Sequence, residues 1–189
     1  MNQRAIILNK NSFNSNKKVE ERTQQRVPLI RFIKHPAFDS VTFLHDIAVV
    51  LFQNDLTINR YVQPIALPPQ QSSEWLVNGS EVELCGWGST SDTEIIYPDE
   101  LQCAKMNYVD FDICNSCDHY CNELLDGQIC AGILNSGGKD ACPGDSGSPL
   151  VQDNMVVGTV SWGFGSCGND KYPGVYVDVA YYSDWISMN

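Results

Sequence analysis

The residue with the clearest chemical potential is Ser146, which lies among glycines in residues 137–150 (GGKDACPGDSGSPL). A serine on a tight glycine turn can expose its hydroxyl group as a nucleophile. The glycines also allow backbone N–H groups to approach the oxygen of a carbonyl under attack. The segment could therefore catalyse acyl transfer. Judged by composition alone, it fits a glycine-rich surface turn equally well.

A serine nucleophile needs a base to remove its proton, and imidazole is the most common one. The chain contains three histidines, His35, His45 and His119. Asp46 directly follows His45, and neighbouring side chains on a strand point to opposite faces, so we do not expect Asp46 to orient that ring. His119 lies in a cysteine-rich segment far along the chain. Neither His45 nor His119 is therefore expected to act as a base for Ser146.

The cysteine-rich segment, residues 114–121 (CNSCDHYC), places three thiols close to one imidazole. Such a run could bind zinc. Structural zinc sites usually take two pairs of ligands from separated segments, and the eight cysteines of the chain favour disulfides in an oxidising compartment. We therefore expect no metal site. Cys117 and Cys121 could pair with each other, or with Cys85 or Cys103.

Composition excludes several classes of function. The net charge of −11 and the sequence pI near 4.5 do not favour binding to nucleic acid or to an anionic membrane surface. No run approaches the roughly 18 apolar residues of a membrane span. The 189 residues are 43% hydrophobic, which is enough for one domain with a substantial core. Residues 78–80 (NGS) form an N-glycosylation sequon.

Short apolar runs rich in β-branched and aromatic residues recur along the chain, and glycine, proline, asparagine or aspartate separates them. They predict an all-β sandwich or barrel. The runs cover residues 27–33, 47–52, 82–87, 101–109, 149–151, 155–162 and 174–179. Two segments are expected to be helical, residues 110–121 and 181–188. The polar residues 9–25 predict an exposed loop or hairpin, and residues 68–73 predict a linker between two halves.

The motifs taken together resemble the chymotrypsin-like serine proteases of the trypsin branch. Residues 144–149 (GDSGSP) are similar to the nucleophile loop of that family, whose core reads Gly-Asp-Ser-Gly-Gly-Pro. Further similar motifs follow in the family's order at residues 44–50 (LHDIAVV), 85–88 (CGWG), 128–132 (QICAG), 161–163 (SWG), 173–176 (PGVY) and 185–186 (WI). The resemblance implies an all-β fold of two antiparallel six-stranded Greek-key barrels, the first incomplete, with a C-terminal helix. It implies one peptidase domain over residues 1–189, with residues 1–68 in the first barrel and residues 69–189 in the second barrel and the helix.

The resemblance also implies roles for individual residues. Ser146 would be the nucleophile of an endopeptidase, and the backbone N–H groups of Gly144 and Ser146 would form the oxyanion hole. Asp46 would orient the catalytic imidazole. Asp145 would accept a salt bridge from the N-terminal ammonium group that activation cleavage releases. No cofactor is implied.

A specificity pocket follows from the same resemblance. Asp140, six residues before Ser146, falls at the floor of the pocket, where a carboxylate selects Arg or Lys in the substrate. Ala141 replaces a serine common in the family, which predicts a preference for Arg over Lys. The implied walls are Ser161, Trp162, Gly163 and Gly174. The expected partners are protein or peptide substrates with Arg or Lys at the cleaved bond, and protein inhibitors.

Part of the family's machinery is missing from the written chain. The family's base lies in an Ala-Ala-His-Cys motif before the aspartate, which is absent here, and His35 matches a surface loop instead. We expect the chain to begin just after that motif, without an activation sequence, a signal peptide or the first barrel strands. Two hypotheses remain: an extracellular trypsin-like endopeptidase truncated at its N-terminus and inactive as written, or a non-catalytic homologue that binds and regulates partners.

The resemblance finally implies two disulfides, Cys114–Cys130 and Cys142–Cys167. Cys85 and Cys103 match family positions whose partners usually lie elsewhere, one of them at Gln152 and the other in the missing N-terminal region.

Overall fold

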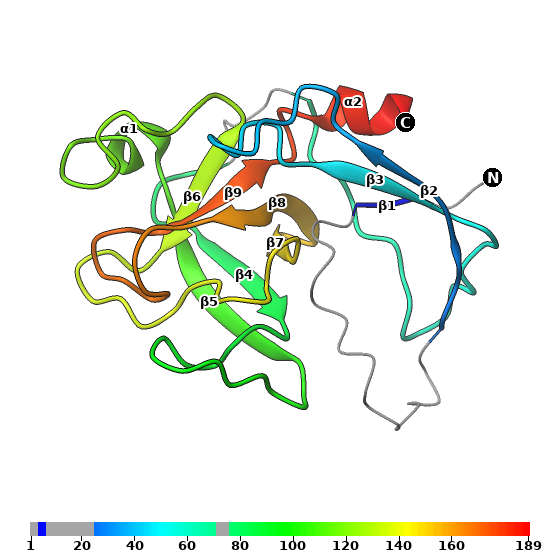
Figure 1. Cartoon of the computed structure of the whole chain (residues 1–189), viewed down its shortest axis with the longest axis horizontal. Helices are drawn as coiled ribbons and strands as arrows, with labels where there is room; N and C mark the ends of the chain where they lie inside the picture. The colour runs from blue at the N-terminus through cyan, green and yellow to red at the C-terminus, as the bar shows by residue number, and fades with distance from the viewer. Residues whose placement is uncertain (1–3, 7–24, 71–75) are drawn as a thin grey trace.

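The computed structural model describes residues 4–6, 25–70 and 76–189 (Figure 1). Within these ranges the chain forms nine strands and two short helices. The elements are β1 (Arg4–Ile6), β2 (Leu29–Lys34), β3 (Ala48–Phe52), β4 (Glu81–Gly86), β5 (Gln102–Val109), α1 (Phe111–Cys114), β6 (Gln128–Gly132), β7 (Pro149–Gln152), β8 (Met155–Trp162), β9 (Gly174–Asp178) and α2 (Ser183–Met188). None of the helices in the described ranges is long and apolar enough to cross a membrane.

Six of the strands close into an antiparallel barrel in the order β4-β5-β6-β9-β8-β7. The sequence builds this barrel by alternation, as in β4, where Val82 and Leu84 are buried and their neighbours are more accessible. Met106, Leu150 and Tyr176 complete a closely packed interior. Burying each large aliphatic side chain contributes about 1.5–3 kcal/mol to folding. The barrel is therefore a rigid support for the loops at its ends.

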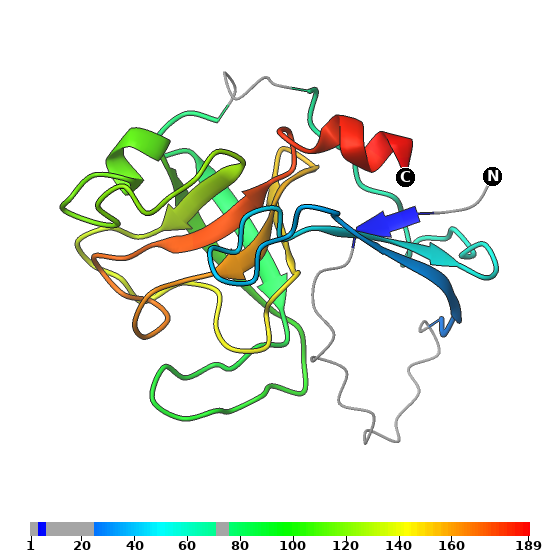
Figure 2. The ribbon, with the colours of Figure 1, turned by 45° about the horizontal axis from the view of Figure 1, so that its top comes forward.

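A second, three-stranded antiparallel sheet lies beside the barrel in the order β1-β3-β2 (Figures 1 and 2). Its central strand β3 is buried on both faces, since Val49 and Val50 are each 1% exposed. The edge strand β2 is open, and its Ile30 and Phe32 are 61% and 58% exposed. The expected all-β class with a C-terminal helix is confirmed. Of the two expected barrels, one closed barrel and one smaller sheet are seen in the described residues.

The two expected helices differ in outcome. Residues 183–188 form α2, and Trp185, Ile186 and the preceding Tyr182 pack on the barrel and on Ile47, the residue before β3. The other prediction, a helix over residues 110–121, is wrong beyond its first turn. Asp110 caps α1 by accepting a hydrogen bond from the backbone of Asp112, and the helix ends at Cys114. The chain then turns through positive φ values at Cys121 and Asn122, which an α-helix cannot contain.

Two expectations about loops fall largely on residues outside the described ranges. The exposed loop or hairpin expected at residues 9–25 lies outside them except for Gln25. The linker expected at residues 68–73 is described only as far as Gln70.

All eight cysteines are paired in the structure. The Cys114–Cys130 and Cys142–Cys167 disulfides are the two that the resemblance implies. Cys117 bonds to Cys121, one of the alternatives that the sequence left open. These bonds occupy the thiols of the segment considered for zinc.

The pairing of Cys85 with Cys103 corrects the expectation that their partners lie elsewhere. The two residues lie directly opposite each other on β4 and β5, with Cα atoms 4.1 Å apart. Opposite residues of antiparallel strands point to the same face, so the two sulfur atoms meet without distortion of the sheet register.

Replacing both Cys85 and Cys103 by serine is expected to lower the free energy of unfolding by about 3 kcal/mol, because the bond closes a loop with a sequence separation of 18. Urea denaturation would measure the loss. The matched control is the double serine variant of Cys117 and Cys121, which closes a separation of 4 and should lose about 2 kcal/mol. An unchanged free energy for the first variant would contradict the pairing.

Candidate active site

The loop between β6 and β7 folds the nucleophile segment into a tight turn. The backbone N–H of Asp145 donates to the carbonyl of Cys142 at 2.9 Å, and the N–H of Gly147 donates to the carbonyl of Val160 at 3.0 Å. Gly144 has φ of +104°, a conformation that strongly favours glycine. In the described part of the chain no acceptor pairs with the backbone N–H of Gly144 or Ser146. Both donors are free to bind a negatively charged oxygen.

Asp145 is held in a cradle made by two glycines of the residue 85–88 motif. The residue is 7% exposed, and its carboxylate accepts hydrogen bonds from the N–H groups of Gly88 at 2.7 Å and Cys142 at 3.0 Å. A Cβ atom at Gly86 or at Gly88 would overlap this carboxylate. The motif is recognisable from the sequence by resemblance, but this reason for its two glycines is visible only in the structure. In the sequence, the only indication of the cradle is that the two glycines, Gly86 and Gly88, stand two positions apart.

Asp145 also lines a cavity of about 490 Å³. Gly86, Gly88, Asp92 and Asp140 contribute to the same cavity. Among the described residues Asp145 forms no salt bridge. The carboxylate therefore faces a space in which a cation could approach it.

A second cavity, of about 200 Å³, contains the residues expected to form the specificity pocket. Ser146 lines it together with Asp140. The expected wall residues Ser161, Trp162, Gly163 and Gly174 line it as well. Residues separated by up to 34 positions along the chain thus meet around one space, because the ends of β8 and β9 lie beside the loop that carries Ser146.

Asp140 is the principal charged group of this cavity. Its Oδ1 accepts the N–H of Ala141 at 2.7 Å, and its Oδ2 accepts the N–H of Gly168 at 3.1 Å. Burial raises the pKa of Asp140 to about 6, although these two hydrogen bonds act in the opposite direction. A buried carboxylate with a raised pKa gains strongly from a cationic partner.

Two glycines make room for a long side chain beside Asp140. A Cβ at Gly174 would lie 2.5 Å from the Oδ1 atom of Asp140, so any other residue there would displace the carboxylate. Gly163 has no atom within 4 Å of the position that its Cβ would take. The entrance is open at Gly163, and the carboxylate remains accessible because position 174 is glycine.

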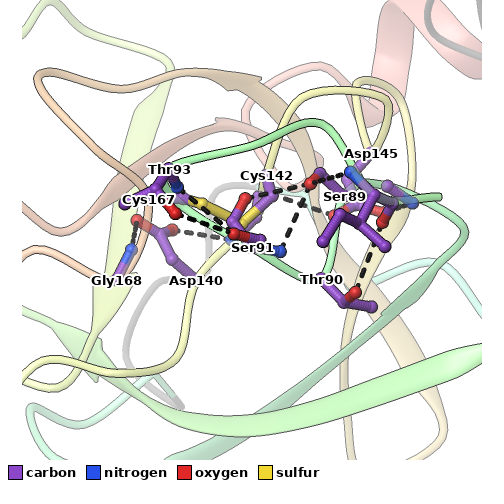
Figure 3. Close-up of a disulfide and its surroundings, with 12 residues drawn as sticks. Ser89, Thr90, Ser91, Thr93, Asp140, Cys142, Asp145, Cys167 and Gly168 are labelled. Atoms are coloured by element: carbon purple, nitrogen blue, oxygen red, sulfur yellow. Dashed lines mark hydrogen bonds between the residues drawn. A yellow bond between two sulfur atoms is a disulfide. The ribbon is translucent and has the colours of Figure 1, made fainter. Parts of the chain in front are cut away.

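The Cys142–Cys167 disulfide joins the two loops that line this cavity (Figure 3). Figure 3 shows Asp140 bonded to Gly168 on one side of the disulfide and Asp145 on the other. The bond between Asp140 and Gly168 crosses the same two loops. Together they fix the position of the carboxylate relative to Ser146.

Asp46 reaches the site from the smaller sheet. It lies in the loop before β3, and its Oδ2 accepts a hydrogen bond of 2.7 Å from the hydroxyl of Ser161. Ser161 is the extra residue of a β-bulge, since Val160 pairs with Tyr176 and Trp162 pairs with Val175. Bulges commonly redirect a side chain beside a functional site. Burial raises the pKa of Asp46, and the bond from Ser161 lowers it.

The side chains of the three histidines contact groups other than Ser146 and Asp46. His35 and His45 stack with ring centroids 4.5 Å apart, and the Nδ1 of His45 is 2.8 Å from the hydroxyl of Tyr182. His119 binds the backbone carbonyl of Lys171 at 2.6 Å. The reason expected for His45 was wrong, because β3 begins only at Ala48 and His45, with a positive φ of 57°, does not lie on a strand.

Comparisons with known proteins show which proteins the chain is similar to. A family model described as Trypsin matches residues 7–186. Trypsin-3 of Salmo salar is 36% identical over 169 residues, which are 89% of this chain and 68% of that protein. Trypsin eta of Drosophila melanogaster is 40% identical over 85% of this chain and 59% of its own length.

Kallikrein-14 of Homo sapiens is 36% identical over 88% of this chain. The chain spans only 59% of Trypsin eta and 60% of Kallikrein-14. A solved structure of neuropsin, a serine protease expressed in the limbic system of mouse brain, superimposes with a TM-score of 0.79. It is 31% identical, and the match covers 87% of this chain and 71% of that one.

Proposed function

Because the chain belongs to the trypsin family of serine proteases, we propose that its site is that of an endopeptidase acting after Arg and Lys. The observation that carries this proposal is the buried Asp140 carboxylate in the cavity that Ser146 also lines. A carboxylate there attracts a guanidinium or ammonium group, and it repels acidic side chains and binds apolar ones poorly.

Each group of the site has a place in the reaction. The Oγ of Ser146 bonds to the carbonyl carbon, and its proton passes to a base. The resulting oxyanion accepts hydrogen bonds from the N–H groups of Gly144 and Ser146. The C–N bond then breaks as the base returns the proton to the leaving amine, and water later hydrolyses the acyl-enzyme.

The base of this scheme is an imidazole oriented by Asp46. The Ser161 hydroxyl occupies Oδ2 of Asp46, and the remaining lone pairs can accept an imidazole N–H. His35, His45 and His119 are all held in other contacts. We therefore propose that these 189 residues bind a basic substrate without turning it over, and that hydrolysis needs an imidazole from outside them.

Asp145 is proposed to accept an ammonium group such as a chain N-terminus. Support comes from its burial, from the 490 Å³ cavity beside it and from lone pairs that its two backbone donors leave free. A charge bound there would hold the loop that carries the two oxyanion donors, because Asp145 lies between Gly144 and Ser146.

Binding and regulation without cleavage is the second candidate function. The engagement of all three histidines favours it for the chain as written. Protein substrates and protein inhibitors with an exposed Arg or Lys are the proposed partners in either case. The four disulfides support an extracellular location.

The specificity can be tested by binding alone. We expect a short peptide that ends in Arg to bind about tenfold more tightly than one that ends in Lys, because Ala141 provides no hydroxyl to bind the shorter ammonium. Isothermal titration would compare peptides that end in Arg, Lys or Phe. Ala141→Ser should reduce the difference between Arg and Lys. If the peptide that ends in Phe bound as tightly as the peptides that end in Arg or Lys, the proposal would be contradicted.

A further inference from the structure

A small loop closed by the Cys117–Cys121 disulfide lies beside the wall of the 200 Å³ cavity that contains Asp140. We call residues 117–121 the disulfide loop. It is compact, because the N–H of Cys121 donates to the carbonyl of Ser116 at 2.8 Å and that of His119 donates to the same carbonyl at 3.0 Å. The Cys114–Cys130 bond anchors α1 to β6 independently. The disulfide loop is thus an addition to a segment that is already attached to the barrel.

Two consecutive side chains of the disulfide loop bind one backbone segment. The Nδ1 of His119 lies 2.6 Å from the carbonyl oxygen of Lys171 and must be its donor, since a carbonyl only accepts. The hydroxyl of Tyr120 donates to the carbonyl of Pro173 at 2.7 Å, and Tyr120 is 3% exposed. The carbonyls on both sides of residue 172 are therefore fixed from the same loop.

That backbone segment leads directly into the pocket. Gly174 follows this segment and begins β9. Because Gly174 has no side chain, the Asp140 carboxylate has room beside it. The ring of Tyr120 also meets Trp162 edge-on, with centroids 5.2 Å apart. Gly174 and Trp162 both line the cavity, so the disulfide loop contacts one lining residue, Trp162, and the residue that precedes the other, Pro173.

We propose that the disulfide loop is a positioning element for the pocket that binds Arg or Lys. Closure by Cys117–Cys121 limits the conformations of His119 and Tyr120, which in turn hold the carbonyls of Lys171 and Pro173. The walls at Trp162 and Gly174 are thereby fixed at the spacing that a cationic side chain requires. This inference rests on the proposed Arg and Lys specificity.

Binding of benzamidine, a flat cation whose amidinium group is similar in size to a guanidinium group, tests this role by isothermal titration. The double variant Cys117→Ser, Cys121→Ser and the single variant His119→Ala should each bind benzamidine about five- to tenfold more weakly than the wild type. His119→Asn retains an N–H donor near the position of Nδ1 and should restore affinity to within about twofold. A role limited to folding would not produce this rescue.

The matched control is the double variant Cys85→Ser, Cys103→Ser, which removes a disulfide whose residues do not line the 200 Å³ cavity and should bind benzamidine as the wild type does. Wild-type affinity in both the Cys117/Cys121 and His119→Ala variants would overturn the inference. Equal weakening in His119→Asn and His119→Ala would also overturn it, and these two single variants decide the matter if the double variant does not fold. If the wild type and Asp140→Asn bind benzamidine equally, the proposed pocket itself fails, and the inference fails with it.

Discussion

Replacement of Asp140 by asparagine is expected to weaken the binding of benzamidine by about 100- to 1000-fold. The substitution keeps the shape of the side chain and removes the one charge that faces a bound cation in the 200 Å³ cavity. Loss of one partner from a buried charge pair costs about 2–5 kcal/mol. Isothermal titration of both proteins at pH 8 would measure the change.

The same interaction predicts how affinity depends on pH. Burial raises the pKa of Asp140 to about 6 in the free chain, so the carboxyl group becomes neutral below that pH. A bound cation favours the ionised form, and affinity should therefore be constant above pH 7 and fall about tenfold per pH unit below pH 6. The effect on folding has the opposite sign. Protonation of Asp140 stabilises the empty fold at low pH, and this stabilisation is lost as the pH rises through 6.

Asp153→Asn is the control for charge, because it removes the same charge at an exposed turn between β7 and β8. It should leave both the affinity and its pH profile unchanged. Binding by Asp140→Asn within threefold of the wild type would show that the pocket does not recognise a cation through this residue.

The second large effect concerns catalysis. The purified 189-residue chain is expected to hydrolyse an arginyl p-nitroanilide no faster than its Ser146→Ala variant. Loss of the base lowers the turnover of a serine protease by about 10⁴-fold or more, even when the oxyanion donors remain. The histidines of this chain are stacked on each other or bound to Lys171. Release of p-nitroaniline, measured over hours, would set the limit.

A binding experiment under the same conditions makes this result informative. If the chain binds benzamidine and yet does not hydrolyse the anilide, the pocket is formed and only the chemical step is missing. Rapid, saturable hydrolysis that Ser146→Ala abolishes would contradict the prediction, and it would require one of the three histidines to reach Ser146.

Much of the site could be predicted because its residues lie close together in sequence. Asp140, Gly144, Asp145 and Ser146 occupy one loop, so a short motif contains most of the chemistry. The all-β class was predictable for a similar local reason, since alternating burial as in β4 is visible in the residues themselves.

Features that depend on strand register could not be predicted in the same way. Whether Cys85 meets Cys103 is decided by the pairing of β4 with β5, which residue types alone do not specify. The bulge that directs Ser161 toward Asp46 is an irregularity of two paired strands. The contact of the His45 ring with Tyr182, 137 residues further along the chain, likewise depends on the tertiary fold.

One structural feature limits how the chain can vary. Asp140 and Cys142 line both the 490 Å³ cavity and the 200 Å³ cavity, so the two cavities share part of their walls. Surface loops normally tolerate insertions and deletions well. Here a change of one residue in length between positions 140 and 146 would displace the walls of two cavities at once. With respect to changes in length, this loop should therefore be as intolerant as an interior strand of the barrel.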